Sequence, residues 1–148
     1  MAELKLFQKL FLVLVFTTWF LVGVIWYVQL VQYPSFSLAS PESFRTIHEF
    51  HSKWTGAIVV PTMTLELILS IFFFFLFRNW FLGIQLSLVL LIWGFTFFVF
   101  VPIHGELGKA WSPELVSQLV SSNWIRTILW SLRGILFLGF FPEIYNRL

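Results

Sequence analysis

The sequence has few charged residues and no cysteine. Only 11% of its 148 residues are Asp, Glu, Lys or Arg, whereas 59% are hydrophobic and 21% are aromatic. A soluble domain carries about 25% charged residues, so most of this chain must face lipid instead of water. The absence of cysteine excludes thiol catalysis, thiolate metal sites and iron–sulfur clusters. A net charge of +2 without a basic run argues against a nucleic-acid partner.

Four apolar segments are long enough to cross a hydrocarbon core, which takes roughly 20 helical residues. We expect helices at about 10–31, 41–77, 80–103 and 113–141, the second and fourth of which begin before the membrane at Ser-Pro-Glu sequences. One short and two long connections join these helices, and the long ones lie on one face. The predicted fold is therefore all-α, a single integral membrane domain over residues 1–148 built as an up-down-up-down four-helix transmembrane bundle.

The two halves of the chain share a pattern that indicates two related helical hairpins. In each half an apolar span is followed by a proline (Pro34 or Pro102), a loop, Ser-Pro-Glu and a tryptophan (Trp54 or Trp124). The first apolar run lacks a small-residue cleavage site, so we interpret it as a retained helix and not as a secretory signal. The distribution of Lys and Arg favours both termini in the cytoplasm.

Polar residues are costly inside a membrane, and here they gather at the end of the bundle that carries the long connections. All three histidines of the chain, His48, His51 and His104, lie at that end. Residues three apart on a helix point to one place, so these imidazoles are candidate ligands for zinc, copper or iron, or for a haem. The alternative is that interfacial histidines only hydrogen-bond to loop backbone.

A second interpretation of the same end needs no metal. His51, Tyr33 and Arg126 are candidate catalytic residues, with the histidine as general base on a weakly acidic lipophilic substrate and the arginine stabilising the oxyanion. The same pocket is predicted to contain Gln29, Trp93, Asn123 and Trp124. The structural alternative is that Arg126 reaches lipid phosphates and that the tryptophans form an interfacial belt.

Two charged residues lie deep in the predicted bundle. At ~1.5 Å per residue, Glu66 and Arg133 are both on the order of 15–20 Å from the long-connection ends of their helices. An unpaired charge at this depth costs at least ~2.5–3.5 kcal/mol, so we expect the two residues to form a buried ion pair. This pair either fixes the second helix against the fourth, or it forms the floor of a substrate cavity or takes part in proton transfer.

Several short motifs resemble those of a known group of proteins. They are Gln32-Tyr33-Pro34-Ser35-Phe36, Phe50-His51, Val60-Pro61 with Glu66, Val101-Pro102-Ile103-His104 and Ser122-Asn123-Trp124-Ile125-Arg126-Thr127. The chain resembles small bacterial four-span membrane proteins of unassigned function, and its arrangement is similar to that of the anthrone oxygenase-like membrane proteins. The resemblance implies a place in the bacterial inner membrane and the oxidation of an aromatic, lipophilic substrate by oxygen. It transfers no single catalytic residue.

These observations lead us to expect a membrane-embedded oxidoreductase that acts on a small lipophilic substrate at the His-rich pocket, with a transition metal, with haem or without a cofactor. The alternative is a non-enzymatic membrane subunit that binds lipid, quinone or haem. The expected partners are membrane lipid, the lipophilic substrate and, in a homo-oligomer, further copies of the chain. Transport is a third interpretation, but four short helices with one deep acid–base pair make a poor conduit.

Overall fold

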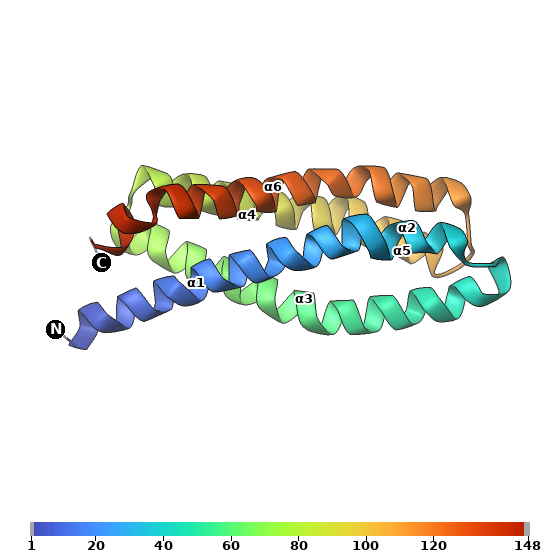
Figure 1. The fold of residues 1–148 in the computed structure, drawn as a ribbon, viewed down its shortest axis with the longest axis horizontal. Coiled ribbons are helices and arrows are strands. Elements are labelled where there is room, and N and C mark those ends of the chain that lie inside the picture. Colours follow the sequence, from blue (N-terminus) through green and yellow to red (C-terminus); the bar gives the residue numbers. More distant parts are fainter. Residues whose placement is uncertain (1, 147–148) are drawn as a thin grey trace.

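The computed structural model describes residues 2–146, and the side chains of residues 5–146. The described residues form helices and no strand. Four rods of helix run antiparallel, and the two ends of the chain lie at the same end of the bundle (Figure 1). Each rod is long and apolar enough to cross a membrane. The predicted all-α, multi-pass membrane bundle is therefore confirmed.

Two of the four rods are composite, because a π-helical turn interrupts the α-helix. In chain order the elements are α1 (Ala2–Tyr27), η1 (Val28–Gln32), α2 (Tyr33–Ser35), η2 (Phe36–Leu38), α3 (Pro41–Phe77), α4 (Trp80–Phe95), η3 (Thr96–Phe100), α5 (Val101–Leu107) and α6 (Pro113–Tyr145). The first rod comprises α1 to η2 and the third comprises α4 to α5, while α3 and α6 are uninterrupted. η1 and η3 are the π turns, and η2 is a short 3-10 helix.

The rods extend further than the sequence predicted. The first begins at residue 2 instead of 10 and ends at 38 instead of 31, the third ends at 107 instead of 103, and the fourth ends at 145 instead of 141. Pro34 and Pro102 do not end their helices, because a π turn before each proline absorbs the missing backbone donor. At the N-terminus, Leu, Lys and Gln are good helix formers and continue the helix beyond the apolar run.

The predicted starts of the second and fourth rods are confirmed at their caps. The Ser40 hydroxyl accepts from the Ser43 amide at 3.3 Å, and the Ser112 hydroxyl accepts from the Leu115 amide at 3.2 Å. A proline occupies the first turn of each helix, where its missing N–H costs nothing. The short connection between α3 and α4 turns on Arg78, which is left-handed at φ 44°.

The two halves of the bundle are packed differently. At the short-connection end, the fully enclosed rings of Phe11, Phe73, Phe81 and Phe137 pack mostly edge to face and hold the rods together. Toward the other end α3 diverges from α6 (Figure 1). Pro61 lies inside α3, where proline removes a backbone hydrogen bond and favours a bend.

The outer surface of the bundle is apolar. Large side chains point outward from several rods, among them Phe16, Phe98 and Leu138, which are 70%, 84% and 62% exposed. A water-soluble monomer does not expose so many large apolar side chains. This surface fits contact with membrane lipid, as the composition predicted.

Candidate functional site

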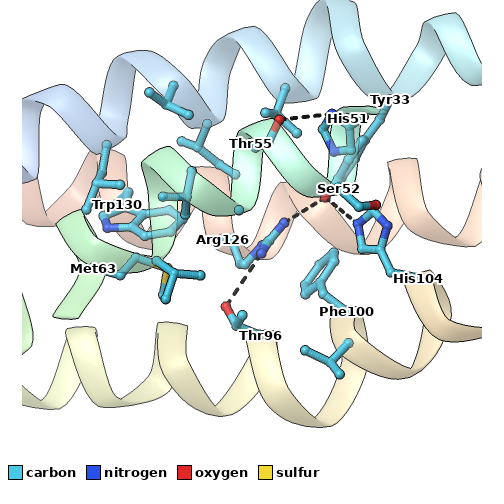
Figure 2. A pocket seen from close by; sticks show the side chains of 18 residues that line it. Tyr33, His51, Ser52, Thr55, Met63, Thr96, Phe100, His104, Arg126 and Trp130 are labelled. Atoms are coloured by element: carbon cyan, nitrogen blue, oxygen red, sulfur yellow. Dashed lines mark hydrogen bonds between the residues drawn. The ribbon is translucent and has the colours of Figure 1, made fainter. Parts of the chain in front are cut away.

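A cavity of about 280 Å³ lies in the long-connection half of the bundle. Its walls come from all four rods, with residues from α1, η1, α2, α3, η3, α5 and α6, and most of these residues are apolar. At one end, however, the side chains of Tyr33, His51, His104 and Arg126 converge (Figure 2). We call this end, formed by these four side chains, the polar end of the cavity.

The two π turns place side chains from the first and third rods at the polar end. The Tyr33 amide donates to the Val28 carbonyl, and the Val101 amide donates to the Thr96 carbonyl, each five residues back. A proline comes directly after each of these amides and has no N–H of its own, so a regular α-helical ladder cannot continue there. The extra residue in each turn changes the direction of the helix beyond it, and π turns are often found at functional sites for this reason.

A chain of hydrogen bonds runs through the polar end. Arg126 Nη2 donates to the Tyr33 hydroxyl at 3.2 Å, and this hydroxyl lies 3.0 Å from His104 Nε2 (Figure 2). His104 Nδ1 in turn shares a proton with His48 Nε2 at 2.9 Å. The tautomer of His104 sets the direction of both imidazole bonds, because the hydroxyl is able to donate its own hydrogen and also to accept a second bond. The tyrosine is thus hydrogen-bonded to a cation on one side and to an imidazole on the other.

Arg126 is held from behind by amides. The Asn123 side-chain oxygen accepts from Arg126 Nε at 3.0 Å and from Nη2 at 2.6 Å. Asn123 in turn donates to Gln29 Oε1 at 2.9 Å, and Gln29 donates to the Val120 carbonyl at 3.1 Å. On its other side the guanidinium lies 3.6 Å from the centre of the Phe100 ring. Gln29 and Asn123, which were predicted as pocket residues, therefore position Arg126 and do not line the cavity themselves.

The three histidines form a stacked cluster, of which only two members face the cavity. His51 and His104 line the wall with their rings 5.8 Å apart and nearly parallel, and His51 also bonds to the Thr55 hydroxyl at 3.1 Å. His48 lies behind His104, where it stacks on Phe44. The histidines thus come together as predicted from the sequence, but as hydrogen-bonded neighbours.

The predicted metal site is not found in this geometry. Among the side chains of residues 5–146, no group of three or more His, Cys, Asp or Glu is arranged to hold a metal ion. Both ring nitrogens of His104 are used, one by Tyr33 and one by His48. The 2.9 Å between His48 Nε2 and His104 Nδ1 is a hydrogen-bond distance, so these two imidazoles bond to each other.

Two predicted pocket residues lie elsewhere. Trp124 is 40% exposed and packs edge to face on Trp26 at the outer surface, because it comes directly after Asn123 and successive helix residues point about 100° apart. Trp93 packs against the core beside Phe97, one turn before η3. Neither side chain lines the cavity.

Some residues that line the cavity were not predicted from the sequence. Trp130 and Met63 form the deep end of the cavity, and Thr96 and Phe100 form part of the wall below the polar end (Figure 2). Trp130 lies four residues after Arg126, so helical spacing alone places the two on one face. Met63 lies three residues before Glu66, so the same spacing places these two on one face of α3.

Beneath the deep end, Glu66 and Arg133 form the ion pair that their depth predicts. Arg133 Nε lies 3.2 Å from Glu66 Oε1, and both side chains are fully buried. The contact is electrostatic, since the Nε–H does not point at the carboxylate. Trp130 donates to the second carboxylate oxygen at 3.2 Å and so connects this pair to the wall of the cavity. Neither charged residue lines the cavity itself.

The remaining bonds of the pair reach every rod. Thr18 of α1 donates to Glu66 at 2.7 Å, and Arg133 donates to the Ser70 hydroxyl of α3 at 2.8 Å and to the Gln85 carbonyl of α4 at 2.6 Å. Of the two roles considered for the pair, fixing the helices against one another fits these contacts.

Comparison with protein families, with curated proteins and with solved structures finds no match to this chain. The fold and the cavity alone define its class, a four-span membrane protein with an apolar cavity whose polar end lies on the long-connection side.

Proposed function

We propose that the protein binds a small lipophilic molecule that carries one polar group, with this group at the polar end of the cavity. The observation that carries the proposal is the shape of the site, an apolar cavity with hydrogen-bonding side chains gathered at one end. At about 280 Å³ it is close to the lower limit of small-molecule pockets, which span ~300–1,000 Å³. A compact ring system or a short chain would fill it.

The position of the cavity suits a molecule that comes from the bilayer. His51 at the polar end lies about one helical turn before Trp54, where the predicted membrane-spanning part of α3 begins, and Met63 at the deep end lies about three turns after His51. Ser52, Val60 and Val101 line the cavity and are also exposed on the outer surface. These three residues mark an opening between α3 and α5, through which a ligand would enter from lipid.

A second candidate function, oxidation of the bound molecule, is favoured by the hydrogen-bond chain at Tyr33. With His104 in the tautomer whose Nε2 accepts, a proton leaving the substrate would pass to the tyrosine oxygen while the tyrosine proton moves to His104 Nε2, and Arg126 would stabilise the resulting oxyanion. With oxygen as the oxidant, a substrate CH2 group would become a carbonyl and one water would be released. This reaction needs no bound metal.

Filling the cavity tests the proposed binding. A Cβ at Gly56 meets no atom within 4 Å, and Gly56 belongs to the cavity wall, so Gly56→Leu should occupy the ligand volume without disturbing the bundle. Gly23 is equally open but lies outside the cavity, which makes Gly23→Leu the matched control. The measurement is the quenching of tryptophan fluorescence by naphthalene derivatives, because Trp130 lines the site.

We expect Gly56→Leu to weaken binding by about tenfold or more, the cost of overpacking by a few methylenes, and Gly23→Leu to bind like the wild type. Equal affinities in the two variants would contradict the proposal, because they would show that the probes sit only in detergent or lipid. Oxygen uptake recorded in the same samples tests the second candidate function. Tyr33→Phe should abolish this uptake, while the probes still bind with lower affinity because one hydrogen bond at the polar end is lost.

A further inference from the structure

Two buried arginines lie on one helix, and only one of them has a carboxylate partner. Arg126 is 7% exposed and Arg133 is fully buried, and both belong to α6. Arg133 has the carboxylate of Glu66 beside it. Arg126 forms no ion pair with any carboxylate in residues 5–146. The acids on the long-connection side of the bundle lie elsewhere. Two of them are in the exposed pairs Arg45–Glu49 and Lys109–Glu106, and the others are in the first turns of α3 and α6.

All the hydrogen-bond acceptors around Arg126 are neutral. They are the Asn123 amide oxygen, the Tyr33 hydroxyl and the Thr96 hydroxyl, the last at 3.5 Å from Nη1. These contacts use Nε, both hydrogens of Nη2 and at most one hydrogen of Nη1. A guanidinium has five N–H donors, so the second Nη1 hydrogen has no acceptor among the described residues.

This free donor belongs to a residue that lines the cavity (Figure 2). Burying a cation without an opposite charge is strongly unfavourable, and neutral dipoles offset only part of the cost. The face of Phe100 against the guanidinium adds a weak attraction but no countercharge. An anionic group in the cavity would supply both the missing acceptor and the missing charge.

We infer that the ligand is a small lipophilic monoanion whose charged oxygen lies against Arg126. This inference rests on the proposed function and adds the charge of the ligand to it. Carboxylates, enolates and phenolates share the required chemistry, an anionic oxygen on an apolar body. Tyr33 is placed to bond the same oxygen, because its hydroxyl is within 3.2 Å of Arg126.

A matched pair of probes separates charge from shape. 1-Naphthoate and 1-naphthamide have nearly the same size, but only the first carries a negative charge. Titrations in non-ionic detergent and in phosphatidylcholine nanodiscs should both show naphthoate binding about tenfold tighter than the amide, because a charge-assisted bond is stronger than a neutral one by about this factor. A preference present in detergent and absent in nanodiscs would overturn the assignment, since a lipid phosphate would then be the occupant.

The variant Asn123→Asp tests the role of Arg126 without removing it. Asp has the shape of Asn, and its carboxylate would lie 2.6–3.0 Å from the guanidinium nitrogens that Asn123 now contacts, while the bond that Asn123 donates to Gln29 would be lost. Arg126 would then have an internal countercharge, as Arg133 has. We expect the affinity for naphthoate to fall to that of naphthamide, while continued binding of the amide shows that the cavity is still formed.

Ser121→Asp is the control, because it adds the same charge to an exposed position of α6 two residues away. This variant should keep the wild-type preference for naphthoate. Equal binding of the two probes to the wild type would overturn the monoanion inference alone, whereas the absence of binding by either probe would overturn the proposed function and this inference with it. A preference that survives in Asn123→Asp would also overturn the inference.

Discussion

Glu66 and Arg133 show how few polar residues are needed to fix a membrane bundle. Through them, hydrogen bonds or ion contacts reach α1, α3, α4 and α6 at one level. Lipid offers no competing hydrogen bonds, so a wrongly packed bundle would leave these groups without partners. The pair therefore favours one arrangement of the four rods over others.

A double-mutant cycle measures this contribution. Glu66→Gln and Arg133→Gln should each lower the free energy of unfolding in detergent by about 3–5 kcal/mol, because each leaves a buried charge without its partner. The double variant should lose less than the sum of the two, with a coupling of about 1–3 kcal/mol. The exposed pair Arg45–Glu49 serves as the reference, with an expected coupling of about 0.3–0.5 kcal/mol. A coupling near zero for the buried pair would show that the two residues do not interact.

The sequence predicts this pair well and the polar end only in part. The depth of a charged residue in the membrane follows from the rise per residue of the helix. Only Arg133 was predicted to lie at the depth of Glu66, so it was the one expected partner. The gathering of His51, His104, Tyr33 and Arg126 also results from helix ends that share one face. Which side chains point into the cavity depends on the rotation of each helix about its axis, because neighbouring residues point about 100° apart. For Trp124 the prediction was wrong, since its ring packs on Trp26 at the outer surface.

The elements carry a repetition that the sequence only suggested. In the first and third rods a π turn precedes an Xaa-Pro pair, and the next rod begins with a Ser-Pro-Glu cap. The similarity of the two hairpins thus extends from residue order to backbone geometry. A proline by itself is compatible with the end of a helix as well as with a π turn, so the sequence predicted helix ends at positions where the rods continue.

Restoring the missing donor should remove a π turn and its effect on the site. In Pro102→Ala the new amide can bond to the Phe98 carbonyl four residues back, and the helix can then return to regular α geometry. His104 would rotate away from Tyr33, so we expect naphthalene probes to bind at least about tenfold more weakly, while the thermal unfolding temperature stays equal or rises because proline disfavours a helix interior.

Pro142→Ala is the control for that experiment, since Pro142 lies inside α6 far from the cavity. Both variants gain a backbone donor, but only Pro102→Ala should affect binding. Unchanged affinity in Pro102→Ala would contradict the idea that the π turn positions His104.

At the scale of the whole molecule, composition and the lengths of the apolar segments are enough to predict the class of fold. Long apolar segments, a short connection and two long ones leave little choice except an antiparallel bundle. A pocket at this end was predicted from the gathered polar residues, but the shape of the cavity could not be, because it depends on the divergence of α3 and on two π turns that break the regular helical register. The divergence of α3 and the π turns are irregular features, and they cannot be predicted from sequence periodicity because that method assumes regular helices.

The orientation of the bundle can be tested because the chain contains no cysteine. Single cysteines at Ala110, in a long connection, and at Asn146, near the C-terminus, should report opposite sides of the membrane. The charge distribution predicts cytoplasmic termini, so a membrane-impermeant maleimide added to bacterial spheroplasts should label Ala110→Cys and spare Asn146→Cys. The reverse pattern would contradict the orientation, and labelling of both positions would contradict the bundle topology.

The two arginines of α6 also bear on how the chain enters the membrane. α6 is the least apolar of the four spans, and an arginine at the centre of a lone helix costs ~2.5–3.5 kcal/mol on insertion. It is also the fourth span in order of synthesis, so Thr18, Glu66 and Gln85 are already in the bilayer when it emerges. The insertion of α6 into the bilayer is therefore coupled to its packing against the first three spans. A substitution that removes the partners of Arg133 in those spans would then prevent α6 from inserting.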